Sequence, residues 1–172
     1  MDKTISLKYI WKNEYIIQAY KYHRQSSRNY RRRNAVCFVI GIAQLIFALY
    51  KIFVEHDLPA LIFMVSGIYL LLINKIQFYF YYRNLQRLNY ENKQIEWKIN
   101  AEKIIHRILN ISESTFSWDL IYGVLDTPEG FLLYPQQHMF YWLPKKAFAN
   151  EEDFAQFAYL AHNKVQNWQQ IK

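Results

Sequence analysis

Two long apolar segments, separated by only three residues, constrain the fold of this chain more than any other feature. The first covers residues 35–54 and carries a single charge, Lys51, and the second covers residues 58–73 and carries none. At 1.5 Å of rise per residue, a helix of about twenty residues spans about 30 Å, the thickness of the hydrocarbon core of a bilayer. Two such helices joined by so short a connection must run antiparallel, so we predict a transmembrane helical hairpin.

The second segment is expected to continue as a helix beyond its apolar part. It leads into an aromatic block at residues 78–82 (FYFYY), and aromatic rings favour the headgroup layer of a membrane. No proline occurs between residues 61 and 91 to end the helix. We therefore predict the hairpin over residues 35–82 and a helical extension over residues 83–93.

Basic residues gather at the outer ends of both apolar segments and are absent from the connection between them. That connection holds only Glu55, His56 and Asp57. Loops that remain in the cytoplasm carry an excess of Lys and Arg close to the ends of the spans. We predict that both termini lie in the cytoplasm, at a bacterial inner membrane or an equivalent internal membrane. The basic side chains expected to contact lipid headgroups are Arg28, Arg31, Arg32, Arg33, Lys75, Arg83 and Arg87.

A soluble fold, a cleaved signal peptide and nucleic-acid binding each fit this sequence less well than a membrane hairpin does. A soluble chain of 172 residues could bury one such helix, but two would leave little core for the remainder. The first apolar segment lies too deep in the chain for a cleaved signal peptide. The single cysteine, Cys37, excludes a disulfide framework.

The net charge of +7 is a feature that nucleic-acid-binding proteins can share. However, charges within a few turns of a span are better explained by topology and anionic headgroups, at about 1 kcal/mol each. We therefore expect no nucleic-acid partner.

Residues 1–34 are predicted to form a strand and a juxtamembrane helix on the cytoplasmic side. Residues 4–9 alternate polar and apolar side chains, which is typical of a half-buried strand. From about residue 12 the apolar residues follow helical spacing, and neither proline nor glycine occurs before Gly41. We therefore predict one continuous helix that runs through the arginines into the first span.

Residues 94–172 are predicted to form a cytoplasmic β-rich domain that ends in a helix. Residues 151–169 place apolar side chains at three- and four-residue spacing, with Asn150 as the N-cap. Before them come short β-branched and aromatic runs separated by turn residues. We expect an α+β fold with one small antiparallel sheet, this helix packed across it, and an added strand from residues 4–9. The predicted strands are residues 95–99, 104–109, 115–118, 122–126, 131–134 and 140–143.

One stretch of this domain has a distinctive pattern: a tryptophan followed by an acid and apolar residues, an acidic hairpin turn, an apolar strand, and a Leu-Pro-Lys-Lys-Ala-Phe element before the final helix. The residues that carry this pattern are Trp118, Asp119, Ile121, Val124, Phe131, Leu132, Leu133, Tyr134, Leu143, Pro144, Lys145, Lys146, Ala147 and Phe148. The stretch resembles the C-terminal half of the YcxB-like family of bacterial membrane proteins. Leu143 and Lys146 stand where that family usually has isoleucine and arginine.

The order of the parts is also similar to that of the family, so in layout the resemblance covers essentially the whole chain. It implies a membrane-anchored domain with a pleckstrin-homology-like β-fold. Within that domain, Trp118 and Phe148 lie among apolar neighbours, and we expect them to be buried anchors of the core.

No constellation of catalytic residues is visible in the sequence. The four glycines are isolated, so no phosphate-binding or nucleotide-binding loop is present. Asp119 or Asp126 could supply a carboxylate and Lys145 with Lys146 a phosphate site, but turn and strand-end chemistry explains these residues more simply. We expect no enzymatic activity, no cofactor and no metal. The histidines, none at metal-ligand spacing, are His23, His56, His106, His138 and His162.

Gln44 is the one costly polar side chain inside the first apolar segment, because an amide without partners is expensive in hydrocarbon. One interpretation is a pore or transport pathway. The interpretation that we favour is a hairpin clasp, in which Gln44 bonds to Ser66 at similar depth on the second helix. Ser66 is next to Gly67, and the small Gly41 and Ala48 flank Gln44.

These features predict a membrane-anchored, non-enzymatic interaction protein that binds membrane lipids and a larger membrane protein complex. Its expected role is that of an accessory, regulatory or assembly factor, since aromatic side chains are enriched at protein interfaces. The alternative from another class is a lipid-sensing or transport component that acts as a homo-oligomer. A specific partner complex that co-purifies would distinguish the first from the second.

Overall fold

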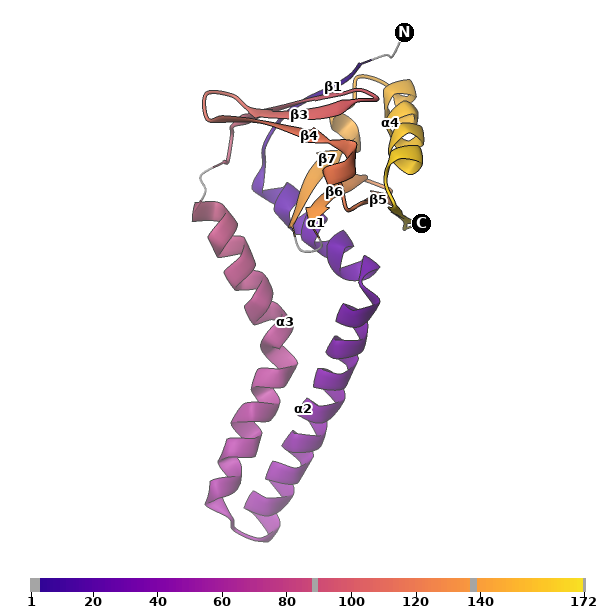
Figure 1. Ribbon diagram of the computed structural model, residues 1–172. Coiled ribbons are helices and arrows are strands. Elements are labelled where there is room, and N and C mark those ends of the chain that lie inside the picture. The colour runs from indigo at the N-terminus through magenta and orange to yellow at the C-terminus, as the bar shows by residue number, and fades with distance from the viewer. Residues whose placement is uncertain (1–3, 88–89, 137–138, 172) are drawn as a thin grey trace. The chain divides into compact units, whose positions relative to one another are not determined.

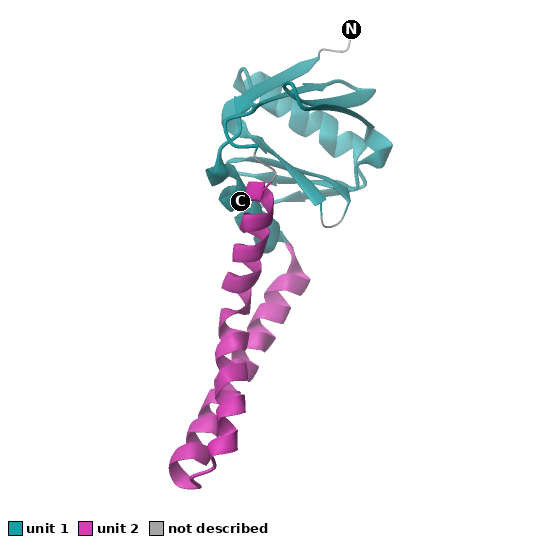
Figure 2. Cartoon of the chain, turned by 90° about the vertical axis from the view of Figure 1, so that its left-hand side faces the viewer, with its two compact units in different colours: residues 1–26, 89–172 teal, residues 27–88 magenta. Residues whose placement is uncertain are grey.

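The structure of this protein is a computed structural model that describes residues 4–87, 90–136 and 139–171. The chain divides into two compact units (Figure 2). Unit 1 comprises residues 1–26 and 89–172, and unit 2 comprises residues 27–88. The N-terminal segment therefore belongs to the same unit as the C-terminal domain.

Unit 2 is a helical hairpin, as predicted. Helix α2 (Arg28–Val54) and helix α3 (Leu61–Arg87) run antiparallel and are joined by a short 3₁₀ turn, Leu58–Ala60 (Figure 1). His56 adopts a left-handed backbone with φ of 57° where the chain reverses. Helix α3 ends at Arg87, within the helical extension predicted over residues 83–93. Later in that segment, Lys93 N donates a hydrogen bond to Tyr90 O and forms a turn where a helix was expected.

The prediction of one continuous helix from residue 12 into the first apolar segment is wrong. Helix α1 (Asn13–Ser26) ends before Ser27, and α2 begins after it. Ser27 has an extended backbone, and its side chain accepts a hydrogen bond from Tyr30 N at 3.2 Å. Serine is among the preferred N-cap residues, so it starts a new helix at a point where helical periodicity alone predicts none.

The first sheet of unit 1 contains the four antiparallel strands β1 (Ile5–Ile10), β2 (Gln94–Ile99), β3 (Lys103–Ile108) and β4 (Ser112–Ser117), in that order. The N-terminal strand pairs with β2 in a register that places Leu7 opposite Trp97. The predicted addition of residues 4–9 to the C-terminal domain is thus confirmed. The alternation of buried and exposed residues along β1 explains why this strand was visible in the sequence.

The second sheet corrects two predictions. Strands β7 (Met139–Pro144), β6 (Gly130–Gln136), β5 (Gly123–Thr127) and β8 (Asn167–Gln170) form a separate sheet, so the single sheet is wrong. Helix α4 (Glu151–Lys164) ends well before residue 169, because Val165 is extended and the chain then forms β8, parallel to β5. Trp168 on β8 packs against Phe131, with ring centroids 6.2 Å apart.

The main core lies between the two sheets, and helix α4 contributes to it. Phe131, Leu133 and Leu143 from the second sheet meet Leu7 and Trp97 from the first. The other face of the second sheet is covered by α1, whose Ala19 and Tyr22 pack on Leu132 and Trp142 (Figure 1). Strand β6 is consequently buried on both faces, which explains its continuous apolar sequence.

The two predicted anchor residues are both in this core. Trp118 is 4% exposed, and its indole N–H donates to Asn100 O at 2.8 Å. Phe148 is 8% exposed and lies beside Phe131, Phe154 and Phe157. Burial of both side chains confirms the prediction that they are part of the core.

The outer face of the first sheet carries a ladder of alternating charges across all four strands. Lys8, Glu96, Arg107 and Glu113 stand opposite one another on β1 to β4. Lys8 Nζ lies 2.7 Å from Glu96 Oε1, and the Arg107 guanidinium donates two hydrogen bonds to Glu113 Oε2. Lys8 also lowers the pKa of Glu96 by bonding to its ionised form. The four charges of this ladder are therefore paired with one another on an exposed face of the sheet.

Candidate functional site

The seam of the hairpin in unit 2 is made of small residues. The residues of α2, the turn and α3 that are buried are Gly41, Ala48, Ala60 and Gly67. Their lack of bulk lets the two backbones approach closely, which is how helices associate where no hydrophobic effect drives them together. At the turn end, Phe47 and Phe63 add an edge-to-face contact with centroids 5.3 Å apart.

Polar side chains bond across the same seam. Ser66 Oγ lies 3.1 Å from both Gln44 Oε1 and Phe63 O, so the two residues of the predicted clasp are brought together. At the open end of the hairpin, Tyr30 donates to Asn74, whose amide donates in turn to Asn34. Polar bonds therefore connect α2 and α3 at mid-length and at the open end.

The seven basic residues predicted to contact headgroups are all exposed on unit 2. Arg33 is held more closely than a free surface residue, because it donates to Gln77 Oε1 at 3.2 Å and its guanidinium lies 5.1 Å from the centre of the Tyr30 ring. Of the basic residues on α2, Arg33 thus contacts the neighbouring helix α3. The sequence predicts lipid contact for these seven residues only from their position beside the apolar segments.

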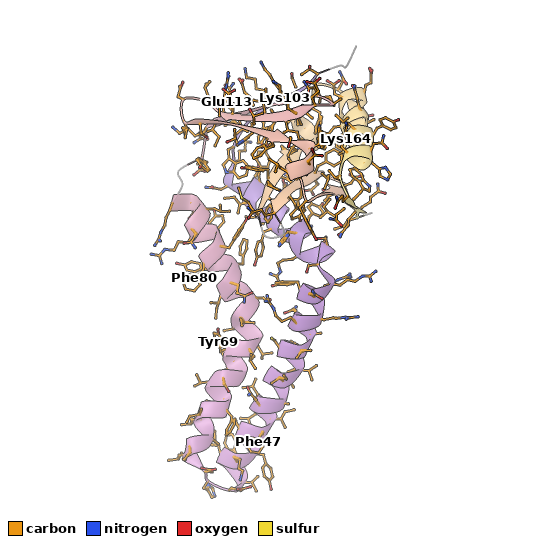
Figure 3. The ribbon with its side chains drawn as sticks, viewed as in Figure 1. Phe47, Tyr69, Phe80, Lys103, Glu113 and Lys164 are labelled. Carbon is orange, nitrogen blue, oxygen red and sulfur yellow. The ribbon has the colours of Figure 1, made fainter. Side chains whose placement is uncertain are left out.

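The outer surface of the hairpin is apolar and exposed. Both helices are long and apolar enough to span a membrane, and only 11% of the most apolar window of each is buried. The core helices of soluble proteins are mostly buried, so this exposure separates the hairpin from such helices. Side chains such as Tyr69 (52% exposed) and Phe80 (55% exposed) project from α3 (Figure 3).

Unit 1 carries a groove of about 720 Å³ that joins distant parts of the sequence. One side comes from the start of α1, and the other comes from the β5–β6 turn, the end of β7 and the start of α4. The second side contains most of the Leu-Pro-Lys-Lys-Ala-Phe element. The lining residues are Lys12, Glu14, Tyr15, Gln18, Pro128, Glu129, Pro144, Lys145, Lys146, Phe148, Asn150, Glu151 and Phe154.

Local chemistry fixes the shape of this groove. Lys145 N donates to Glu129 O at 2.8 Å, which ties the end of β7 to the β5–β6 turn. The Lys145 ammonium lies 3.5 Å from Glu151 Oε1 and 5.0 Å from the centre of the Phe154 ring. Asn150 Oδ1 accepts from Asp153 N at 2.7 Å and so caps α4, as predicted.

The charge balance of the groove bears on the phosphate site considered for Lys145 and Lys146. Three lysines and three glutamates line it, and Lys145 already has a carboxylate partner. An anion would therefore meet glutamates as well as lysines. Aromatic and proline side chains among these charges form a surface suited to a peptide segment with apolar and charged residues.

The histidines are placed separately. His23 lies against Tyr134, His162 against Trp168, and His56 in the turn of the hairpin. His106 is buried between Trp97 and Tyr141, and burial lowers its pKa to about 4. His138 lies outside the described residues. Within the described part of the chain, no group of three His, Cys, Asp or Glu side chains could hold a metal ion.

Asp119 and Asp126 remain apart from the groove lining. Asp119 is the middle residue of a 3₁₀ turn, Trp118–Leu120, that follows β4. Asp126 is on β5, where burial raises its pKa and Gln170 Nε2 donates to its Oδ2 at 2.9 Å. The sequence does not predict the groove, because the two sides of the groove are more than a hundred residues apart in the chain. The predicted pairing of residues 4–9 with the C-terminal domain is the sequence signal that brings the two sides together.

Comparison with known proteins adds one finding. Residues 99–161, from the end of β2 to α4, match the family described as YcxB-like protein. No curated protein and no solved structure matches the chain. The matched segment contains all of the residues from Trp118 to Phe148 that carry the distinctive sequence pattern, as well as one side of the groove.

Proposed function

Because residues 99–161 of this chain are a YcxB-like domain, we propose that the protein is a membrane-anchored interaction protein without enzymatic activity. Unit 2 is the anchor, and unit 1 is a domain that binds a segment of a partner protein in its groove. The partner belongs to a larger membrane protein complex, for which this protein is an accessory, regulatory or assembly factor.

The exposed apolar surface of the hairpin supports the anchor. Two antiparallel helices with small residues and hydrogen bonds at their seam, and large apolar residues outside, are suited to lipid rather than water. The bias of Lys and Arg toward the outer ends favours both termini in the cytoplasm of a bacterial inner membrane or an equivalent internal membrane. We also propose that unit 1 is pleckstrin-homology-like, since two packed sheets and a C-terminal helix share its core.

The groove is the observation that carries the binding role. Its lining includes the aromatic residues Tyr15, Phe148 and Phe154 and charged residues of both signs. The outer face of the first sheet, by contrast, carries a ladder of four charges that are paired across the strands. A partner segment with an apolar anchor and flanking charges would find complementary groups in the groove and few on that sheet.

Purification of the tagged full chain from native membranes in mild detergent tests this function. We expect a specific partner complex to co-purify with the wild type. Lys146→Glu, which reverses an exposed charge of the groove, should reduce recovery of that complex several-fold. The matched control Lys103→Glu reverses an exposed charge at the start of β3, outside the groove, and should leave recovery unchanged.

Two outcomes would contradict the proposal. Equal recovery with both variants would place the partner away from the groove. A protein that purifies alone as a defined homo-oligomer and moves a solute in vesicles would instead be a transport component.

A further inference from the structure

We propose that unit 1 has a second binding surface, which contacts anionic lipid headgroups. It is formed by the last two turns of α1 together with the start of β7, and we refer to it as the α1–β7 surface. The inference rests on the proposed membrane anchorage. It involves none of the seven basic residues of the hairpin and none of the groove residues.

Contacts within unit 1 join the two parts of this surface. The His23 ring lies 4.8 Å from the Phe140 ring, and His23 Nδ1 lies 3.0 Å from Tyr134 Oη. The last turn of α1 is therefore fixed against β6 and β7. Met139, the first residue of β7, precedes Phe140 and is 46% exposed. Alternation along the strand places its side chain on the face opposite Phe140, so a large apolar side chain is left in solvent at this end of the sheet.

The charge carried by the two elements of this surface is positive, and a neighbouring acid, Glu129 of the β5–β6 turn, interacts with Tyr22. No Asp or Glu occurs between Glu14 and Glu55, and residues 130–144 contain no charged residue. Lys21 and Arg24 lie on the last two turns of α1, each 5.5 Å from the centre of a tyrosine ring. Basic and aromatic side chains with an exposed apolar residue form the combination that favours a negatively charged membrane surface.

Chain connectivity keeps the C-terminal end of α1 near the start of α2. Only Ser27 separates α1 from α2, so the Cα atoms of Ser26 and Arg28 are at most about 7.6 Å apart. Arg28 precedes the first apolar residue of α2, Ala35, by seven residues, or about 10 Å of helix. In an anchored protein, the end of α1 is therefore held within reach of the headgroup layer in any orientation of unit 1.

Site-specific fluorescence in nanodiscs tests the proposal on the full chain. In a Cys37→Ser background, a single cysteine is placed by Met139→Cys, by Tyr159→Cys on α4 (74% exposed), or by Ile46→Cys on α2 (63% exposed). Each is labelled with an environment-sensitive dye, and quenching by aqueous iodide is measured. Nanodiscs contain either phosphatidylcholine alone or a 3:1 mixture with phosphatidylglycerol (about one anionic lipid in four).

In the anionic nanodiscs, we expect the label at residue 139 to be quenched several-fold less than the label at residue 159. The protection should decrease in phosphatidylcholine alone and in the double variant Lys21→Gln/Arg24→Gln. Equal quenching at residues 139 and 159 in anionic nanodiscs would overturn the proposal. The same measurement in native membranes provides a second check: protection of residue 139 there, but not in nanodiscs, would indicate a protein partner and would also overturn the proposal.

The label at residue 46 separates this proposal from the anchorage on which it rests. Protection at residue 46 with none at residue 139 leaves the anchor intact and overturns only the α1–β7 surface. Quenching at residue 46 equal to that at residue 159 overturns both.

Discussion

Gly41 and Gly67 face each other where α2 and α3 cross. A Cβ atom added to Gly41 would lie 3.0 Å from Gly67 O, and one added to Gly67 would lie 2.9 Å from Gly41 O. Contacts this short to backbone atoms cannot be relieved by a side-chain rotation. The two glycines therefore set the distance between the helices, and the hydrogen bonds across the seam depend on that distance.

Replacing Gly67 with leucine should separate the helices, because its side chain would have to enter space filled by Gly41 O and Leu45. Overpacking of this kind typically costs about 1–3 kcal/mol. Thermal unfolding in detergent should show a clear loss of stability for Gly67→Leu. Ile62→Leu, at a position 72% exposed on the same helix, is the matched control and should behave as the wild type. Equal stability of the two variants would show that close contact at Gly41 and Gly67 does not determine the stability of the hairpin.

The Gln44–Ser66 hydrogen bond should contribute little to stability. Interhelical hydrogen bonds in membranes average about 0.6 kcal/mol and reach at most about 2 kcal/mol. Gln44→Leu should therefore keep its expression, its unfolding temperature to within a few degrees, and its recovery of the partner complex. A variant that folds normally but loses cellular function would refute the clasp and favour a pathway or a partner's helix at Gln44.

Unit 1 should lose stability on mild acidification because of His106. Burial lowers the pKa of this imidazole to about 4 from its usual 6.5, so between these values the unfolded chain binds a proton that the folded chain does not. The free energy of unfolding should fall as the pH decreases from 6.5 toward 4, by on the order of 3 kcal/mol in total. Urea unfolding at pH 7.5 and pH 5 measures the change.

The variant His106→Gln should have a shallower dependence on pH over this range, because it removes the titrating group. His162→Gln, at an exposed position of α4, is the control and should retain the wild-type slope. If His106→Gln retains that slope as well, another group is responsible for the loss of stability.

Trp118→Ala should strongly destabilise unit 1. The substitution removes a buried ring that lies 6.4 Å from Phe157 and leaves Asn100 O without its indole donor. Truncation of buried aromatic residues typically costs about 3–5 kcal/mol. Tyr122→Ala, at a position 45% exposed, is the control, and unfolding by urea compares the two. A stable Trp118→Ala protein that had lost only its partner would make Trp118 a binding residue instead.

Local patterns explain which parts of the fold could be predicted. The apolar segments, the alternation along β1 and the N-cap at Asn150 each depend on neighbouring residues, and each appears in the structure. The short polar segment that forms β8 has no such pattern, because its strand character comes from pairing with β5 and from Trp168 packing on Phe131. The groove, likewise, exists only once β1 has brought α1 to the C-terminal domain.

The break between α1 and α2 at Ser27 could not be predicted from the sequence for a different reason. Helical periodicity continues from α1 into the arginines, so the average pattern predicts no break. One side-chain hydrogen bond to Tyr30 N is enough to cap α2. The pair Ser26–Ser27 is the feature of the sequence that could indicate an N-cap. Whether a serine caps a helix depends on its backbone angles, which the sequence pattern does not determine.

The most direct test of the account is the membrane topology of the hairpin in intact cells. In a Cys37→Ser background, His56→Cys places a thiol in the turn between α2 and α3, and Gln25→Cys places one at the exposed end of α1. A maleimide that cannot cross membranes should label residue 56 from outside the inner membrane and should label residue 25 only after the cells are opened. Labelling of residue 25 but not residue 56 in intact cells, or labelling of neither until lysis, would contradict a hairpin with both termini in the cytoplasm.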